Sequence, residues 1–437
     1  MYNVFASINT LFAGTGMLFL SLYLMLLGNG LQGSLLGIRG ADEGFTTMAL
    51  SLISMGFYAG YFIGTILVPI LLKRVGYIRV FAALVAIASV AAVAYAMFID
   101  KYSWFVMRVL TGFCFSGIYM ITESWLNSQT HNDNRAKVLG IYVIVIFAGL
   151  STGQLLLNTG SIDGYFLFAL ASVIISLASI PLLLTTRPAP HIEESSTHLS
   201  IYQLYKHSPF GVVSSFFANF LNGGIVGMAA IYAKTINMPT NEIALFVASA
   251  FVGVIILQFP LGYLSDRMDR RKVIVAISLL SLIVATMAMV SENSIQVTLL
   301  FMLLGGLALP MYAICIAYVN DRLQPEEILP ATTALLKIAG VGNVVAPILI
   351  GAIMVRLGDK WFFGSLAVAA AMIVAFGVYR IIKGADVIVE EQGEYSPMGV
   401  STTAATLSLT HEGIQMEFDF GEEHRKPVTT EEKQEIR

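Results

Sequence analysis

Three ionisable side chains lie inside long apolar runs of the sequence: Arg108, Glu123 and Lys337. A charge at the centre of a bilayer is unfavourable by about 2.5–3.5 kcal/mol on insertion scales, so each of the three needs a chemical reason. A carboxylate kept away from water favours its neutral form and can carry a proton from one side of a membrane to the other. Glu123 is therefore the candidate proton carrier. The alternative is a salt bridge from Glu123 to a loop cation such as Arg135.

Arg108 and Glu123 share one apolar run, 15 residues apart, which is about 22 Å along a helix axis and roughly the same face. Arg108 is a candidate for proton coupling, through the proton affinity of a carboxylate, or for binding an anionic part of a solute. Its alternative is a hydrogen bond to backbone carbonyls. Lys337 is a candidate solute contact, and its alternative is an aliphatic stem that carries the amine to the water interface.

The composition shows which solvent surrounds these groups. Of 437 residues, 57% are hydrophobic and 12% charged, against about 45–50% and about 25% in soluble domains. A water-soluble enzyme is excluded, and 25 Lys and Arg against 28 Asp and Glu leave no basic excess for nucleic acid. No nucleotide-binding loop occurs and the histidines lie outside the apolar runs, so we expect neither cofactor nor metal.

Runs long enough to cross a bilayer are the main feature of the chain, since about 20 apolar residues span 30 Å as a helix. They predict an all-α membrane protein with twelve transmembrane helices. The predicted spans are 5–27, 45–71, 77–98, 102–126, 137–158, 163–185, 209–232, 242–265, 272–291, 294–319, 331–355 and 361–382.

Basic residues are unevenly divided between the connections. Fourteen Lys and Arg residues fall in one alternate set and five in the other, which places both termini in the cytoplasm and the chain in the cytoplasmic membrane. The predicted domains are a six-helix bundle at 1–186, a cytoplasmic linker at 187–208, a second bundle at 209–383, and an acidic, disordered tail at 384–437.

The two halves repeat each other. At an offset of 193, Arg74 falls on Arg267 and Tyr119 on Tyr312. At the first helix of each half we predict an offset of 210, which pairs Asn9 with Asn219 and leaves a Gly-rich loop from Gly28 to Gly44. Six helices per half make the repeat parallel, so a solute site is expected between the halves near the bilayer midplane.

Two motifs resemble those of the major facilitator superfamily. Residues 262–272, GYLSDRMDRRK, resemble its loop signature, and Arg108 to Gly112 resembles its Arg-x-x-x-Gly motif. Residues 117–127, GIYMITESWLN, are similar to a poorly characterised bacterial branch. The resemblance implies alternating access and a cavity lined by helices one, four, seven and ten. The residues that it places there are Asn9, Tyr119, Asn219, Asn222 and Tyr312.

Asn343, inside the eleventh span, is a further candidate solute contact. Each of these polar residues has an interhelical hydrogen bond as its alternative.

The loop signature also predicts a gate. Asp266 lies beside cations at a helix end, where it can pair with Arg270 and latch helices on the cytoplasmic side. Arg267 in the same loop, and Arg74 and Arg79 in the corresponding loop of the first half, are further predicted gate residues.

These features predict a monomeric secondary transporter, surrounded by membrane lipid, that moves a small solute across the cytoplasmic membrane and is driven by protons. The fifth helix departs from the antiporter signature, which favours organic-anion uptake or facilitated uniport over efflux as the transport alternatives. A sensor or partner subunit without transport is the alternative of a different class.

Overall fold

The computed structural model describes residues 2–129, 135–184 and 200–383, with side chains in these ranges except at 2–15, 127–129, 135–137, 325, 326 and 329. Within these ranges every regular element is a helix, and twelve segments are long and apolar enough to cross a membrane. A helix satisfies its backbone hydrogen bonds internally, as an apolar solvent requires. The predicted fold class is confirmed.

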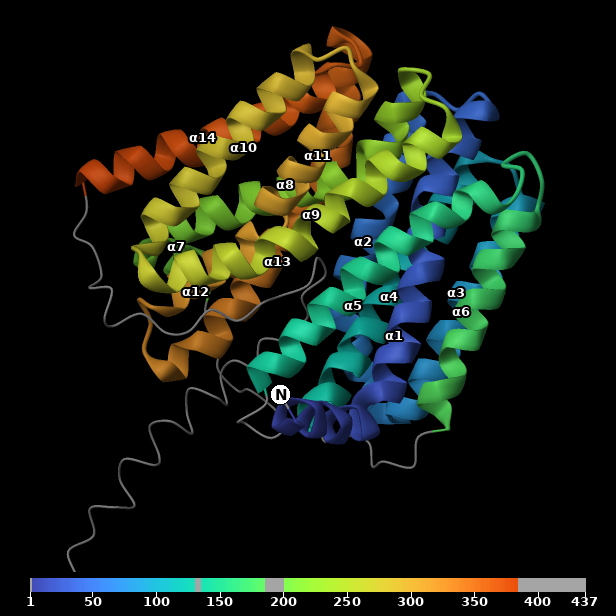
Figure 1. Ribbon diagram of the computed structural model, residues 1–437, viewed down its shortest axis with the longest axis horizontal. Coiled ribbons are helices and arrows are strands. Elements are labelled where there is room, and N and C mark those ends of the chain that lie inside the picture. The colour runs from blue at the N-terminus through green and yellow to red at the C-terminus, as the bar shows by residue number, and fades with distance from the viewer. Residues whose placement is uncertain (1, 130–134, 185–199, 384–437) are drawn as a thin grey trace, which may run out of the picture.

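The helices form two groups that lie side by side (Figure 1). The first group contains α1 (Tyr2–Asp42), α2 (Thr47–Val75), α3 (Tyr77–Met97), α4 (Lys101–Gln129), α5 (Arg135–Leu155) with the short η2 (Leu156–Thr159), and α6 (Phe166–Leu183). The second contains α8 (Pro209–Thr235), α9 (Thr240–Arg267), α10 (Arg270–Val290), α11 (Ser294–Ala308), α12 (Met311–Asn320), α13 (Pro325–Leu357) and α14 (Trp361–Lys383). We call these groups the N bundle and the C bundle.

Two connections have local causes in the sequence. α11 and α12 form one span that is interrupted at Pro310, which has no backbone N–H to continue the helix. Within the predicted linker, Ile201–His207 forms the short helix α7, and Ser200 and Gln203 close a capping box at its start. The predicted tail lies outside the described residues.

The position of the first span differs from the prediction. α1 continues through the predicted loop, so the first span ends at Asp42 rather than at residue 27. The glycines in this stretch permit close helix packing instead of turns: a Cβ on Gly30 would meet the backbone of Leu150 on α5 at 2.6 Å.

This shift also corrects the repeat. The last residues of the two helices, Asp42 of α1 and Thr235 of α8, differ by 235 − 42 = 193. A Cβ on Gly223 would meet the backbone of Asn343 at 2.7 Å, as one on Gly30 meets that of Leu150, and the corresponding residues again differ by 193. The offset of 193 therefore holds from the first helix onward, and the predicted offset of 210 is wrong. Asn219 does not pair with Asn9, and the residue that corresponds to Asn222 is Asn29.

The repeat extends to the contacts between helices. A Cβ on Gly60 of α2 would clash with the carbonyl of Val109 on α4, and a Cβ on Gly253 of α9 would clash with the carbonyl of Met302 on α11. The corresponding residues of the two contacts differ by 193, since 253 − 60 and 302 − 109 both equal 193. Lipid supplies no hydrophobic force between helices, so close packing at small residues holds them together.

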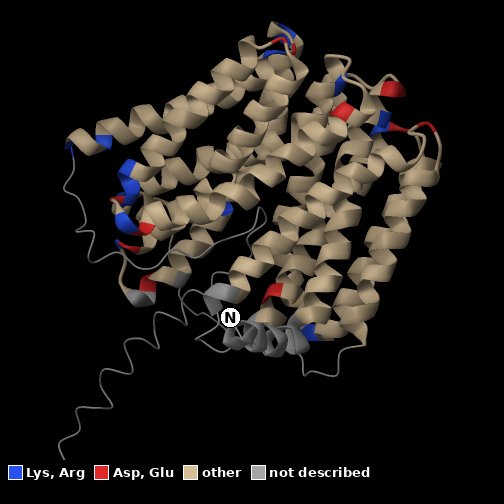
Figure 2. Cartoon of the chain, in the orientation of Figure 1, with Lys and Arg blue, Asp and Glu red and all other residues tan. Residues whose placement is uncertain are grey.

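The two ends of the bundles carry different charges (Figure 2). One, which we call the arginine-rich end, holds Lys73, Arg74, Arg79, Arg267, Arg270, Arg271, Lys272, Arg322, Arg380 and Lys383. The opposite end holds fewer basic residues, namely Arg39, Lys101, Lys234, Arg356 and Lys360. There Asp100 caps α4, and backbone hydrogen bonds from Ser103 and Tyr102 hold the pKa of Asp100 below its ordinary value. This cap begins the helix that carries Arg108 and Glu123.

Candidate functional site

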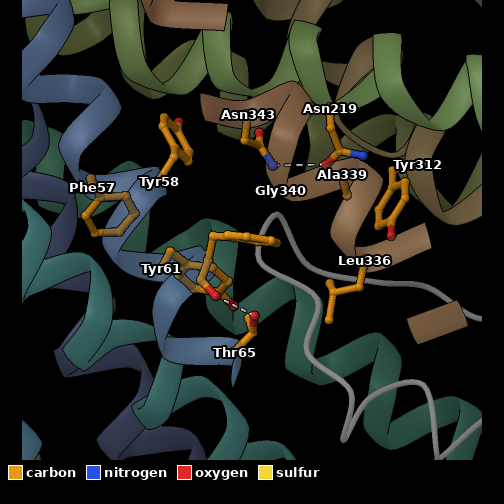
Figure 3. Close-up of a pocket in the computed structure, with 11 residues that line it drawn as sticks. Phe57, Tyr58, Tyr61, Thr65, Asn219, Tyr312, Leu336, Ala339, Gly340 and Asn343 are labelled. Carbon is orange, nitrogen blue, oxygen red and sulfur yellow. Dashed lines mark hydrogen bonds between the residues drawn. The ribbon is translucent and has the colours of Figure 1, made fainter. Parts of the chain in front are cut away.

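A pocket of about 480 Å³, including its open mouth, lies between the two bundles (Figure 3). Its walls come from α2, α8, α12 and α13, so both bundles contribute. The lining residues are Phe57, Tyr58, Tyr61, Phe62, Thr65, Asn219, Tyr312, Leu336, Ala339, Gly340 and Asn343.

The α2 wall is built from one helix face. Tyr58, Tyr61, Phe62 and Thr65 follow the spacing i, i+3, i+4, i+7, which places them on one side of the helix. All four are half-buried. The sequence prediction missed them because it searched for charges and amides, whereas the informative signal was this aromatic spacing in α2.

The C-bundle wall supplies the hydrogen-bonding groups. Asn343 Nδ2 donates to Asn219 Oδ1 at 3.1 Å, and Asn219 Nδ2 donates to the carbonyl of Ser215 at 2.9 Å. Asn343 Oδ1 and the Tyr312 hydroxyl are buried and have no hydrogen-bond partner in the described part of the chain. Among the residues that line the pocket, none is charged. The site therefore offers aromatic faces and neutral polar groups.

Three of the predicted solute contacts, Asn219, Tyr312 and Asn343, thus lie together at the pocket. Tyr119 stands behind the wall, with its ring centroid 6.2 Å from that of Tyr61. Lys337 is exposed and does not line the pocket.

The predicted amides are spread more widely. Asn222 is buried, 6% exposed, and is not part of the pocket wall. The side chain of Asn9 lies outside the described residues. Asn29, the repeat partner of Asn222, is half-buried on the same face as Gly33, beside which there is open space. Extending the offset of 193 to the first helix would have found it.

Arg108 lies behind the aromatic wall. Its guanidinium carbon is 4.5 Å from the centre of the Phe57 ring, a cation–π contact. Its charge interacts with the phenols of Tyr58 and Tyr95. Its Nη1 is buried and has no hydrogen-bond partner among the described residues. Arg108 therefore borders the pocket through Phe57 and Tyr58.

Glu123 is 1% exposed and accepts a hydrogen bond at 2.5 Å from the hydroxyl of Tyr142, which is also 1% exposed. The two residues join α4 to α5. The sequence prediction placed no partner of this kind beside Glu123, because α5 had no signal that singled out one tyrosine. The side chain of Arg135, the predicted alternative partner, lies outside the described residues.

The predicted ion pair of the loop signature is present. Arg270 contacts Asp266 at 3.0 Å and Asp321 at 2.5 Å, so it joins α9, α10 and the end of α12. All three belong to the C bundle. Arg267 stacks on Tyr263 at 4.2 Å, while Arg74 and Arg79 are exposed on the N bundle.

At the opposite end a salt bridge joins the two bundles. Lys234 of α8 pairs with Asp42 of α1 at 2.6 Å. Closer to the middle, the Ser54 hydroxyl donates to the carbonyl of Gly227 at 2.7 Å. These contacts hold the bundles together on the side away from the arginine-rich end.

A family model described as Major Facilitator Superfamily matches residues 10–212 and 210–395 of the chain. The chain belongs to the Major Facilitator Superfamily. It is thus a multi-pass membrane transporter of small solutes and not an enzyme.

Relatives and solved structures agree with this family. The uncharacterized MFS-type transporter YcaD of Escherichia coli (strain K12 / DH10B) is 25% identical over 359 residues, which cover 80% of this chain and 92% of the relative. The nucleoside transporter NupG superimposes with a TM-score of 0.68 at 14% identity, covering 84% of this chain and 99% of that one. The E. coli fucose:proton symporter FucP has a TM-score of 0.54 at 16% identity, covering 83% and 97%.

Proposed function

We propose that this transporter moves a small, neutral, ring-shaped polar solute together with protons. The observation that carries the proposal is the pocket between the bundles. Tyr58, Tyr61 and Phe62 offer flat faces for a ring, while Tyr312 and Asn343 offer unpaired hydrogen-bonding atoms. Nucleosides and sugars, named for the two solved structures above, have this chemistry.

The side from which the pocket is reached is inferred from the basic residues at one end of the bundles and from the salt bridge at the other. By the positive-inside rule the arginine-rich end faces the cytoplasm, so the end closed by Asp42 and Lys234 faces outward. The pocket then loads or unloads from the cytoplasm in this conformation. Rocking of the two bundles about the pocket would open the outer side.

Glu123 is the proposed proton site. It is buried at the cytoplasmic third of α4, and a positioned phenol is its hydrogen-bond donor. Arg108 is 15 residues away along the same helix, about 22 Å, and so serves the pocket wall rather than the carboxylate.

The test is flux in proteoliposomes with an imposed pH gradient, using uridine, L-fucose, an organic anion and an organic cation as probes. We expect Glu123→Gln to abolish accumulation against a gradient while exchange across the membrane continues, because a neutral amide cannot release a proton. Glu242→Gln, at the outer end of α9, is the matched control and should keep accumulation. Full accumulation by Glu123→Gln would remove the proton assignment.

One observation favours a second candidate, uptake of an organic anion. The buried Arg108 Nη1 has no partner in the described part of the chain and borders the pocket through Phe57. A ligand at 100 times its dissociation constant adds about 2.7 kcal/mol to the folded state. Thermal stabilisation by the anion alone, lost in Arg108→Gln, would favour this candidate over a neutral solute.

A further inference from the structure

Glu123 and Tyr142 form a buried pair whose hydrogen bond depends on protonation. The phenol donates to Glu123 Oε1 at 2.5 Å, and neither side chain is more than 1% exposed. A hydrogen bond to an ionised carboxylate is about twice as strong as one between neutral groups. When the carboxylate takes a proton from water, this bond weakens and the Tyr142 hydroxyl is free to turn.

Further phenols lead from this pair to the pocket. Tyr119 lies one turn before Glu123 on α4, on the same face. Its ring meets that of Tyr61 edge to face, with 6.2 Å between the centroids. Tyr61 lines the pocket (Figure 3). The phenols of both Tyr119 and Tyr61 are close enough to that of Tyr142 to interact with it electrostatically.

Other titratable groups on the neighbouring helices have their own contacts. On α1, Tyr23 bonds to Thr152 at 3.0 Å. On α3, Tyr77 packs on Trp125. On α9, Asp266 pairs with Arg270. The side chains of Arg135 and Lys137, at the start of α5, lie outside the described residues.

We propose that Tyr142, Tyr119 and Tyr61 connect the proton state of Glu123 to the shape of the solute pocket. Tyr142 is a positioning residue that sets how readily Glu123 takes up a proton, and Tyr119 passes the resulting movement to the pocket wall at Tyr61. The proton comes from water and returns to water, and the only bond that forms and breaks is the O–H bond of the Glu123 carboxyl group. The inference rests on Glu123 as the proton site of the proposed function.

The first test needs no solute. Trp125 is buried two residues from Glu123, so the tryptophan emission of the purified full-length protein should titrate with pH. The Glu123→Gln variant is titrated in the same way, and the step in the emission curve that is missing in this variant belongs to Glu123. We expect Tyr142→Phe to move its midpoint upward by about one to two pH units, because the ionised carboxylate loses its donor. Tyr23→Phe, outside the chain of phenols, should leave it unchanged.

Glu123→Asp gives a second route if Tyr142→Phe does not fold. The shorter side chain withdraws the carboxylate from Tyr142 without deleting either group, and the midpoint should again rise. An unchanged midpoint in both variants would overturn the role of Tyr142.

The second test measures the pocket. Thr65→Cys places a thiol in the pocket wall, while the native Cys114 and Cys315 are buried. At pH 7.0, we expect adding Glu123→Gln to change its alkylation rate by N-ethylmaleimide at least about threefold, and Tyr61→Phe or Tyr119→Phe to remove that difference. A cysteine at the exposed Ser161 is the control.

The outcomes separate the two proposals. Equal Thr65→Cys alkylation with and without Glu123→Gln would overturn the connection, whatever the flux assay shows. A shifted midpoint and a connected pocket, found together with flux that ignores the pH gradient, would support the connection and overturn the proposed proton-driven transport.

Discussion

Tyr312 and Asn343 each keep a buried oxygen without a hydrogen-bond partner in the described part of the chain. Leaving a buried polar group unpaired is unfavourable by about 1–3 kcal/mol, so such groups mark strain or a ligand site. Here they face a pocket with aromatic walls, so a solute that bonds to both would recover that free energy. This is why we assign them to solute recognition rather than to helix association.

We predict that Tyr312→Phe raises KM about 3- to 10-fold with little change in maximal rate, because the lost interaction is one hydrogen bond. Asn343→Ala should have a larger effect, since it also removes the support of Asn219. Initial rates against solute concentration measure both. Tyr205→Phe, on the exposed face of α7, is the control. Unchanged KM in both pocket variants would argue for a purely structural role.

Pairs of helices in the two bundles are held together by the same glycine contacts. α2 packs on α4 at Gly60, and α9 packs on α11 at Gly253, each against a backbone carbonyl. A carbonyl cannot move aside as a flexible side chain can. These contacts set the positions of α2 and α4, and so of Tyr61, Tyr119 and Glu123.

Gly60→Val and Gly253→Val should therefore each destabilise the protein by about 1–3 kcal/mol or more, as overpacking does. Thermal unfolding of detergent-purified protein would show this as a lower Tm and a lower folded yield. Gly33→Ala is the control, because no atom lies within 4 Å of its added Cβ. A wild-type Tm for Gly60→Val would mean that the α2–α4 packing is looser than described.

The two bundles meet at the proposed outer end, where Asp42 and Lys234 join α1 to α8. Their side chains are 36% and 27% exposed, so water screens the pair. Such pairs contribute up to about 1 kcal/mol, which corresponds to a change of about fivefold in a two-state equilibrium. The pair is therefore suited to biasing the carrier toward the inward-open state without locking it.

Asp42→Lys should shift the population toward the outward-open state by about two- to fivefold, because it replaces attraction with repulsion. The exchanged pair Asp42→Lys with Lys234→Asp should restore the original balance. Spin labels at Ser161 and Glu292, one on each bundle at this end, would report the distance distribution by pulsed electron resonance. Identical distributions in all three proteins would show that the pair has no part in gating.

The sequence alone was enough to predict the fold class and the uneven distribution of basic residues between the loops. It also predicted eleven of the twelve spans to within a few residues. Lipid imposes these features through length, apolarity and charge, which are properties of single segments. The end of the first span was misplaced because its glycines resemble a loop, although they allow close contact with α5. Asn219, Tyr312 and Asn343 were predicted as solute contacts from their polarity inside apolar runs.

Tertiary structure alone decided which side chains meet. Tyr142 reaches Glu123 from another helix, Tyr61 faces the pocket, and Lys337 turns away from it. In a soluble protein the polar face of a helix shows its rotation, but lipid and core are equally apolar here, so hydropathy alone does not show which face points inward. That rotation, set by glycine contacts between segments far apart in the chain, determines the site.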